Sequence, residues 1–371
     1  MSENKNEISI CALTLYPYNL VPGQRYRIEQ WQPFLEKDGI TIDYYAFADK
    51  NLLQIMPQHG KALSKISGLT KAFARRISHL PVLAKYDVIY IYRAAAMIGP
   101  AVIERIIKLS GRPIVFDFDD AIFLTHTNGV NKLFSWVKFA KKTDTICRLS
   151  SQITVGNSFL ADYAKKHNPN VTIVPSGVDI DKFKPKPRLP NDKVIVGWTG
   201  SSTSQTYLEM FTPMIRQLLV RRPNIEFHVH SDREPDMPGV KYFWHPWTAE
   251  TEIEEISRFD IGIMPMPDDG WSLGKCAMKA LLYMSLGIPA VCTDIGANRE
   301  VIKHGINGFL ASTENDWLTH LETLIDNTDL RIKLGMAARD TIVQEYSMRK
   351  CAELFAGAVK QAIISNKGNK T

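Results

Sequence analysis

Short apolar runs alternate with longer amphipathic segments along most of the chain. Runs of this length that are rich in Val, Ile and aromatic residues are typical of buried strands, and the segments between them are long enough for helices. The expected strands are 8–15, 40–47, 86–92, 113–118, 152–156, 171–174, 194–198, 225–230, 259–266, 288–293 and 309–311. Strands that alternate with helices in this way favour an α/β fold with parallel sheets.

A segment rich in proline and lysine interrupts this alternation at about 183–193. Such a composition is typical of a linker between domains. The length of 371 residues also exceeds the usual size of one hydrophobic core. We therefore expect two doubly wound domains, at 1–185 and 191–348, each with its own sheet.

The segment 259–294 carries the clearest candidate for a binding site. Its apolar run leads through a loop with Asp269 into a helix that is expected to begin at Gly274 and Lys275. A helix start that combines a glycine with a lysine is suited to phosphate, because the free N–H groups and the ammonium both attract anions. Lys279 falls on the same side of this helix as Lys275.

The turn after the expected strand 194–198 is a second candidate for phosphate binding. Its residues are Gly200, Ser201, Ser202 and Thr203. Glycine and small hydroxyl residues let backbone N–H groups come close to a phosphate. An ordinary tight turn has the same composition, so both interpretations stay open.

Two arginines in the first half also suggest an anionic ligand. Arg25 and Arg27 fall in the expected first turn of a helix at about 25–37. The helix dipole disfavours cations there, so their placement suggests that they meet a ligand. The alternative is that both side chains extend into water.

Charged residues follow two expected strands of the first half: Arg93 follows 86–92, and Asp119 and Asp120 follow 113–118. Doubly wound folds bind their ligands at the carboxyl ends of strands. We assign these residues to the wall of a ligand site, with helix capping as the alternative for the aspartates. A metal site would need further ligands, which the sequence does not identify.

The net charge of +6 is concentrated in the first half, because residues 1–190 hold 26 Lys and Arg against 16 Asp and Glu, whereas residues 191–371 hold 19 against 23. Seven Lys or Arg and no acid lie within 50–86, most of them in the amphipathic segment 61–85, and 131–142 is a second basic amphipathic segment. Such segments lie on an anionic membrane surface or form ordinary surface helices. No nucleic-acid-binding motif accompanies this charge.

The composition also limits the class of protein. No run of about 18 or more apolar residues is present, so no membrane-spanning helix is expected. The first residues lack the basic and apolar regions of a signal peptide. The five cysteines form no CxxC pair, which argues against a structural zinc site and favours the reducing cytoplasm.

In order and spacing these motifs resemble the GT-B glycosyltransferases, and within them the large retaining group called family 4 or group 1. In the first half the matching pieces are GQRYRI, YDVIYIYR, DFDDAIF and ITVGNSFL…VPSGVDIDKFKP. In the second half they are VGWTGSS, FDIGIMPMPDDGWSLGKCAMKALLYMSLGIPAV, GANREVIKHGINGFL and DLRIKLGMAARDTIVQEYS. The resemblance covers essentially the whole chain.

The resemblance implies two Rossmann-like domains that face each other across a cleft, with the nucleotide-sugar donor on the second domain and the acceptor on the first. It also implies that the last helix, 349–371, packs back on the first domain. Together with the patterns above, it assigns donor binding to Gly200, Ser201, Ser202, Thr203, Asp269, Gly274, Lys275 and Lys279, and acceptor-side or phosphate contacts to Gly23, Arg25, Arg27 and Asn157. Many relatives act on lipid-linked or polysaccharide acceptors at the cytoplasmic membrane face, which favours the membrane interpretation of 61–85 and 131–142.

One departure from the family pattern concerns the donor. The family commonly carries two glutamates eight residues apart, and the corresponding positions here are Gly274 and Leu282. The second glutamate is the residue that holds the donor ribose hydroxyls, so a leucine there puts donor affinity in doubt. Asp268 or Asp269 is the candidate for a carboxylate in its place.

We therefore expect a retaining transferase that moves a sugar from a nucleoside diphosphate to an acceptor hydroxyl in cell-surface glycan synthesis, without a metal or another cofactor. Lys275 and the amides of the turn at 200–203 would stabilise the departing diphosphate, and Asp119 or Asp120, beside Arg93, would serve the acceptor hydroxyl. Two alternatives stay open. One is a catalytically weak scaffold protein of a glycan-assembly complex, and the other is an isomerase that acts on the nucleotide sugar itself. The expected location is the cytoplasm, peripheral on the inner face of the cell membrane.

Overall fold

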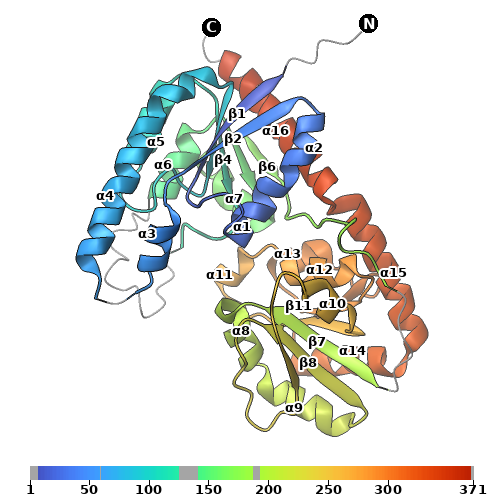
Figure 1. Cartoon of the computed structure of the whole chain (residues 1–371). Coiled ribbons are helices and arrows are strands. Elements are labelled where there is room, and N and C mark those ends of the chain that lie inside the picture. Colours follow the sequence, from blue (N-terminus) through green and yellow to red (C-terminus); the bar gives the residue numbers. More distant parts are fainter. Residues whose placement is uncertain (1–6, 59, 125–140, 187–192, 369–371) are drawn as a thin grey trace, which may run out of the picture. The chain divides into compact units, whose positions relative to one another are not determined.

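The computed structural model describes residues 7–58, 60–124, 141–186 and 193–368 (Figure 1). The chain divides into two compact units, Met1–Ser176 with Met348–Thr371, and Gly177–Ser347. The sequence places the end of the first domain at 185, whereas the structure assigns 177–185 to the second unit.

Contacts with the C-terminal part of the second unit explain this earlier boundary. The amide of Val178 donates a hydrogen bond to the carbonyl of Tyr346 over 2.8 Å. The guanidinium of Arg339 donates to the carbonyls of Ile180 and Phe183 over 2.8 and 2.7 Å. The segment 177–185, which includes the first residues of the expected linker, therefore folds as part of the second unit.

Six parallel strands form the sheet of the first unit, in the order β2-β1-β3-β4-β5-β6. They are β1 (Ile8–Thr14), β2 (Ile40–Ala46), β3 (Val88–Tyr92), β4 (Ile114–Phe118), β5 (Gln152–Val155) and β6 (Val171–Ile173). Every residue of β3, β4 and β5 is buried, as expected for a parallel sheet covered on both faces. The strand order reverses at β1 and β3, and doubly wound folds bind ligands at the carboxyl ends beside such a reversal.

The helices of the first unit cover both faces of this sheet (Figure 1). They are α1 (Pro22–Arg27), η1 (Glu29–Trp31), α2 (Gln32–Lys37), α3 (Lys50–Ile55), α4 (Ala62–His79), η2 (Leu80–Lys85), α5 (Val102–Leu109), α6 (Lys142–Leu149), α7 (Ser158–Lys165) and α16 (Met348–Gly368). The last helix, α16, belongs to this unit and packs against the sheet, since the buried ring of Phe355 lies 5.3 Å from that of Trp31 and 5.5 Å from that of Tyr90.

The helix expected at 25–37 begins earlier and is divided. Helix α1 begins at Pro22, because proline lacks an N–H and its fixed φ suits the first helical position. The backbone leaves the helical conformation at Ile28, where φ is −151°, and α2 starts at Gln32. Arg25 and Arg27 therefore lie in the last turn of α1, where the helix dipole favours cations. The predicted placement of both arginines in an unfavourable first turn was wrong.

The second unit also contains six parallel strands, in the order β12-β11-β10-β7-β8-β9. They are β7 (Val194–Gly200), β8 (Ile225–Ser231), β9 (Phe243–Pro246), β10 (Ile261–Met264), β11 (Ala290–Thr293) and β12 (Gly308–Ala311). This is the strand order of the dinucleotide-binding Rossmann fold, with its reversal between β7 and β10. The sequence missed β9, an edge strand of four residues, because none of its residues is fully buried and it has no apolar run.

The helices of the second unit are α8 (Ser202–Glu209), α9 (Thr212–Arg221), α10 (Glu252–Ser257), α11 (Gly270–Leu273), α12 (Met278–Ser285), α13 (Gly296–Val301), α14 (Glu314–Asp326) and α15 (Thr328–Glu345). Most of them connect successive strands of its sheet, and the last two, α14 and α15, follow β12. The core gathers most tightly around α12, in which Ala280, Leu281, Tyr283 and Met284 are completely buried.

Glycines let α12 and α15 approach each other closely. A Cβ added at Gly335 of α15 would lie 2.1 Å from the carbonyl oxygen of Gly287, which follows the C-cap of α12 and has a φ of +70°. This contact is far shorter than atoms allow. The backbones can therefore pack in this way only if position 335 carries no side chain.

We predict that Gly335→Ala destabilises the second unit by about 1–3 kcal/mol, because the methyl group forces backbone to move in a packed core. Gly357→Ala in α16 is the matched control, since a Cβ at Gly357 meets nothing within 4 Å. That change should be neutral or stabilise by up to about 1 kcal/mol, because alanine favours the helix. Urea unfolding of both variants measures the difference, and equal effects would contradict the close approach.

Candidate functional site

Arg93 organises the carboxyl ends of β3 and β4 in the first unit. Its guanidinium donates two hydrogen bonds to Oδ1 of Asp119, from Nε over 3.0 Å and from Nη2 over 2.7 Å, and also contacts Asp120. The hydroxyl of Tyr92 donates to the same oxygen of Asp119 over 3.0 Å. Arg93 itself has a φ of +61°, a conformation that costs a non-glycine residue free energy and often occurs at functional sites.

Gly23 lies against this cluster from α1. A Cβ added there would lie 2.6 Å from the Tyr92 hydroxyl, 3.3 Å from Oδ2 of Asp119 and 3.4 Å from Nη2 of Arg93. The structure therefore brings together four residues predicted from separate motifs, Gly23, Arg93, Asp119 and Asp120. Only glycine at position 23 leaves room for this arrangement.

The charges of the cluster decide what Asp119 can do. Burial alone would raise the pKa of Asp119, but the guanidinium groups of Arg93 and Arg27 and the hydrogen bonds from Arg93 and Tyr92 hold this pKa below its usual value. An efficient general base has a pKa near the working pH. Asp119 is thus better suited to holding Arg93 in place than to accepting a proton.

Arg27 occupies a different environment from the one that its motif suggests. It is completely buried, and its Nε donates to Oδ2 of Asp117 over 3.0 Å. The remaining lone pairs of Asp117 accept hydrogen bonds from Tyr90 over 3.1 Å and Thr154 over 2.6 Å. Arg27 also donates to the carbonyl of Val174. All these partners lie inside the core. The prediction that Arg27 contacts a ligand is therefore corrected: Arg27 has a structural role.

Arg25 and Asn157 complete the candidates of the first unit. Arg25 is half-buried, and within the described ranges it forms no ion pair. Oδ1 of Asn157 accepts the amide hydrogen of Leu160 over 2.9 Å and so caps α7 after β5. Of the two, Arg25 retains a charge for a ligand, and Asn157 has a capping role.

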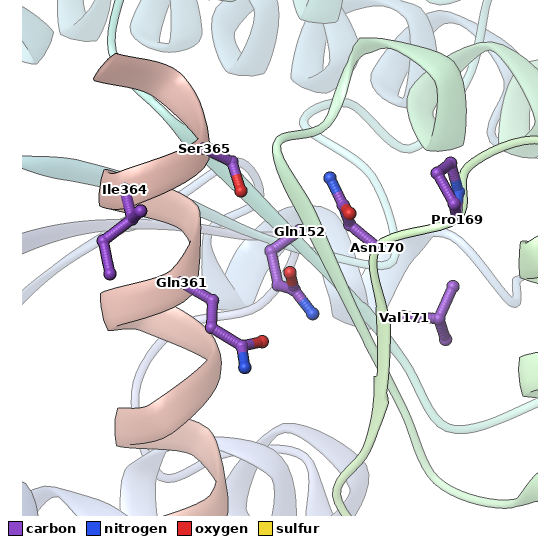
Figure 2. A pocket seen from close by; sticks show the side chains of 7 residues that line it. All are labelled: Gln152, Pro169, Asn170, Val171, Gln361, Ile364 and Ser365. Carbon is purple, nitrogen blue, oxygen red and sulfur yellow. The ribbon is translucent and has the colours of Figure 1, made fainter. Parts of the chain in front are cut away.

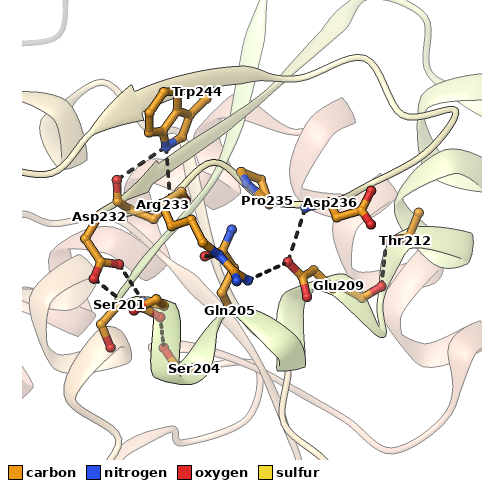
Figure 3. A network of polar contacts seen from close by, with 12 residues as sticks. Ser201, Ser204, Gln205, Glu209, Thr212, Asp232, Arg233, Pro235, Asp236 and Trp244 are labelled. Atoms are coloured by element: carbon orange, nitrogen blue, oxygen red, sulfur yellow. Dashed lines mark hydrogen bonds and ion pairs between the residues drawn. The ribbon is translucent and has the colours of Figure 1, made fainter. Parts of the chain in front are cut away.

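In the second unit, the turn after β7 is braced by Asp232. The amide of Ser202 donates to Oδ1 of Asp232, and the Ser202 hydroxyl donates to Oδ2 over 3.0 Å (Figure 3). The hydroxyls of Ser201 and Thr203 share a hydrogen bond of 2.7 Å. An aspartate therefore already lies where we expected the Ser202 amide to meet a phosphate. The Ser202 amide is therefore not available to an anion, and the turn is held in place by Asp232.

The same network ties the loop after β8 to α8 (Figure 3). Arg233 donates to Gln205 over 3.3 Å and to Glu209 over 3.2 Å. The indole N–H of Trp244 donates to the Ser231 hydroxyl over 3.2 Å. These contacts fix the loop that carries Asp232 beside the end of β7.

The helix expected to start at Gly274 and Lys275 is interrupted. Asp269 caps the short helix α11, as its Oδ1 accepts the amide hydrogen of Ser272 over 2.7 Å. Gly274 ends α11, and Ala277, with a φ of +53°, lies at the N-cap of α12. The left-handed residue breaks the helix, so Lys275 lies in the connection and Lys279 lies in the first turn of α12.

Two ammonium groups gather near these elements. Nζ of Lys279 lies 5.4 Å from the centre of the Trp198 ring, and Nζ of Lys275 lies 4.8 Å from that of Trp271. Burial, and to a smaller extent the charge of Lys275, lowers the pKa of Lys279 to about 8. No carboxylate pairs with Lys279 among the residues that the structure describes. A half-buried cation with this environment is suited to binding an anion.

Leu282 lies on the same helix in the core. It is only 6% exposed and packs in the apolar cluster around α12. The position that matches the ribose-binding glutamate is therefore an apolar core position in this chain. Asp269 caps α11 through the amide of Ser272. Its carboxylate is therefore engaged in this arrangement and does not replace the missing glutamate.

Known proteins resemble the second unit most directly. Residues 193–327 match the family model described as glycosyl transferases group 1. The D-inositol 3-phosphate glycosyltransferase of Corynebacterium kroppenstedtii is 21% identical over 255 residues, which span 59% of this chain and 55% of that protein. Residues 193–327 are therefore similar to the group 1 glycosyl transferases, and the alignment spans little more than half of the curated relative.

Solved structures resemble this chain over almost its whole length. Sucrose-phosphate synthase from Thermosynechococcus elongatus has a TM-score of 0.67 at 11% identity and covers 96% of this chain and 100% of its own. HepE from Anabaena in complex with UDP-glucose has a TM-score of 0.63 at 15% identity, with coverages of 95% and 100%. The lipopolysaccharide outer core galactosyltransferase WaaB, in its apo form, also has a TM-score of 0.63 at 15% identity, with coverages of 95% and 99%. The two Rossmann-like units thus form the GT-B fold.

The region of the family match contains the turn at 200–203, Asp269, Gly274, Lys275 and Lys279. Sequence reasoning missed three residues that lie beside them: Trp198, Asp232 and Tyr283. Tyr283 lies four residues after Lys279, so helical spacing already places it on the same face of α12. Asp232 follows the end of β8, but no sequence pattern indicates that it contacts Ser202 on the neighbouring turn.

The first unit also contains a pocket of about 340 Å³ (Figure 2). It is lined by Gln152 at the start of β5, Val171 at the start of β6, and residues of α16 that include Gln361. It therefore opens at the amino ends of strands, opposite the edge where such sheets bind ligands. Within the described ranges, no helix has the length and apolarity needed to cross a membrane, and no group of three or more His, Cys, Asp or Glu suits a metal ion.

We predict that Arg27→Met lowers the free energy of unfolding by about 3–5 kcal/mol, because it leaves Asp117 charged, buried and without its cation. Arg25→Met on the same helix is the control and should change stability by less than about 0.5 kcal/mol. Chemical unfolding of both variants tests this. A small effect of Arg27→Met would contradict the structural role that we assign to it.

Proposed function

We propose that this glycosyltransferase moves a sugar from a nucleoside diphosphate sugar to a hydroxyl of a lipid-linked or polysaccharide acceptor, in the synthesis of a cell-surface glycan. One observation carries the proposal: the ammonium of Lys279, with Lys275 near it, lies at the carboxyl end of β7 and lacks a carboxylate partner in the described part of the chain. A diphosphate supplies the negative charge that this environment lacks.

The chemistry needs stabilisation of a departing diphosphate. The bond between the anomeric carbon and the β-phosphate oxygen breaks, and its electron pair stays on the phosphate. A bond forms between that carbon and the acceptor oxygen, and the acceptor proton passes to the departing phosphate. Attack on the face that the phosphate leaves retains the anomeric configuration and needs no protein nucleophile. The ammonium groups of Lys275 and Lys279 act on the charge that develops in the transition state, and no metal is needed.

Two of the similar structures support the choice of donor and pathway. HepE was crystallised with UDP-glucose, and WaaB is described as a galactosyltransferase of the lipopolysaccharide outer core. We therefore propose a UDP-sugar as the first donor to examine. In the first unit, Arg93 held by Asp119 and Asp120, together with Arg25, forms the proposed acceptor side.

We predict that Lys279→Ala and Lys275→Ala each lower turnover by about 100-fold or more, because each removes a charge that stabilises the leaving diphosphate. The release of nucleoside diphosphate from a panel of UDP-, GDP- and ADP-sugars, with an acceptor extract present, measures the rate. Lys333→Ala, an exposed lysine on α15, is the control. Rates like that of the wild type in both variants would refute the assignment.

A second candidate function is favoured by the buried Leu282. Without a ribose-binding acid, the chain would act as a scaffold protein that keeps the fold but binds donors weakly. Calorimetry with the same panel, together with an assay of diphosphate release, separates the two functions, because a scaffold binds none of the donors productively, whereas the transferase binds at least one and releases its diphosphate.

We also propose that α4 contacts an anionic membrane surface. Its residues Leu63, Ile66 and Ile77 are 84%, 60% and 55% exposed, and Lys61 and Lys71 are exposed beside them. Exposed apolar side chains that alternate with lysines are suited to the boundary of an acidic bilayer.

Two basic residues of α4 do not contribute to this surface. Arg76 is completely buried and donates to the carbonyls of Thr14 and Tyr45 over 2.7 and 3.0 Å. Arg75 is paired with Asp49 over 2.8 Å. Most of the second basic segment, 131–142, lies outside the described residues. Lys142 at its end is paired with Glu104 over 3.3 Å within the first unit.

We predict that replacing Lys61, Lys65 and Lys71 together by Glu abolishes co-sedimentation with vesicles that contain acidic lipid, because each lysine near the surface contributes about 1 kcal/mol. A variant with Glu at Lys182, Lys241 and Lys333, which are exposed in the second unit, has the same net charge and should still bind. Equal loss in both variants would indicate net charge as the cause and would refute a role of α4.

A further inference from the structure

Two aromatic side chains connect α12 with the end of β7. Lys279 and Tyr283 lie one turn apart on α12 and both reach the end of β7: Lys279 lies against Trp198 and Gly200, and Tyr283 contacts Thr199. Neither aromatic residue carries a charge or a nucleophile. Their geometry nevertheless determines where the ammonium of Lys279 lies.

Trp198 supports the ammonium directly. The Trp198 side chain is 1% exposed, and the ammonium of Lys279 lies 5.4 Å from its ring centre. A Cβ added at Gly200 would lie 2.5 Å from Cη2 of Trp198 and 2.7 Å from Cε of Lys279. The lysine stem and the indole ring are therefore both packed against the backbone of the turn. The negative face of an aromatic ring also attracts a cation.

Tyr283 fixes the helix to the two central strands. Its hydroxyl accepts the amide hydrogen of Thr199 over 2.9 Å and donates to the carbonyl of Ile263 over 3.2 Å. Its ring lies on Gly262, where an added Cβ would be 2.3 Å from Cδ2 of the ring. Burial raises the pKa of Tyr283, so the hydroxyl keeps its proton and both hydrogen bonds. A shift of α12 along the strands would break both of them.

We propose that Trp198 and Tyr283 are positioning residues that hold the ammonium of Lys279 at the turn after β7, ready for the diphosphate of the donor. This inference rests on the proposed function. Tyr283 sets the height of α12 relative to β7, and Trp198 sets the direction of the lysine side chain. A lysine on a flexible stem loses rotamer freedom on binding an anion, and a side chain that is already held in place avoids most of that loss.

The proton on Lys279 gives this arrangement a measurable signature. Because burial and the charge of Lys275 lower the pKa of Lys279 to about 8, part of the ligand-free protein lacks this charge in mild alkali. A bound diphosphate favours the protonated form. Affinity is therefore highest below about pH 8, falls as the pH rises through that value, and binding above it is accompanied by proton uptake.

Titration calorimetry between pH 6.5 and 9.5 tests the proposal, with UDP and inorganic pyrophosphate as probes. We expect Tyr283→Phe and Trp198→Leu to weaken pyrophosphate binding at pH 7 by about tenfold, the effect of losing one well-placed interaction. The decline in affinity should move to higher pH, because a less confined ammonium has a pKa nearer 10.5. Trp198→Phe keeps an aromatic face and should restore most of the affinity.

The matched control is Tyr346→Phe, which removes another tyrosine hydroxyl of the same unit, one that donates to the carbonyl of Glu300 over 3.2 Å. This change should lower thermal stability and leave the pH profile as in the wild type. If Tyr283→Phe and Trp198→Leu also lower stability but keep the affinity and the pH midpoint of the wild type, their role is only structural and the proposal is overturned.

A second measurement separates this proposal from the proposed function. The pKa of Lys279 in the ligand-free protein can be followed by NMR after ¹³C-methylation of the lysines, with Lys279→Arg to assign the signal. If the wild type binds neither probe, the proposed function fails. A rise of the Lys279 pKa in Tyr283→Phe and Trp198→Leu would still support the positioning, and an unchanged pKa would overturn it.

Discussion

Three positions without side chains allow large residues to pack against the central strands of the second sheet. A Cβ at Gly197 would lie 2.2 Å from the ring of Phe259, one at Gly262 would lie 2.3 Å from Tyr283, and one at Gly200 would overlap Trp198. Glycine weakens an isolated strand, so its use on two neighbouring strands indicates a close approach that the fold requires. This approach brings α12 near the reversal of strand order between β7 and β10. The first turn of the helix, and the lysine in it, consequently lies where a doubly wound sheet binds its ligand.

The two units hold the cations Arg27 and Lys279 in opposite ways. Arg27 is enclosed with Asp117, and hydrogen bonds from Tyr90 and Thr154 satisfy the rest of that carboxylate. Such a pair is complete without a ligand and stabilises a single arrangement of the core. Lys279 is half-buried against an indole ring without a carboxylate partner in the described residues, and it releases its proton more readily as a result. Of the two, only Lys279 is left without a negative charge nearby in the described part of the chain, and a bound anion would supply that charge.

Most strands could be predicted from the sequence because parallel strands buried on both faces appear as apolar runs. Once a strand was located, the charged residues directly after it could be identified as candidates for a ligand site. The errors concern interactions that no local pattern encodes. The start of α12 was placed too early because Ala277 adopts a left-handed conformation that alanine rarely takes. Arg27 was assigned to a ligand because its partner, Asp117, is 90 residues away. The role of Asp232 depends on a contact between neighbouring strands, which becomes visible only once β7 and β8 are paired.

Leu282 places a further constraint on how a donor is held under the proposed function. A glutamate at that position would bind ribose hydroxyls through charged hydrogen bonds, each contributing about 1.5–3 kcal/mol. The buried leucine offers none of these bonds, so more of the binding energy must come from the diphosphate. The attraction between Lys279 and a diphosphate weakens as the salt concentration rises and as Lys279 loses its proton. Hydrogen bonds to ribose hydroxyls do not depend on either. A site with leucine at position 282 therefore depends more on where its ammonium group is held. The rigid attachment of α12 through Tyr283 is consistent with that dependence.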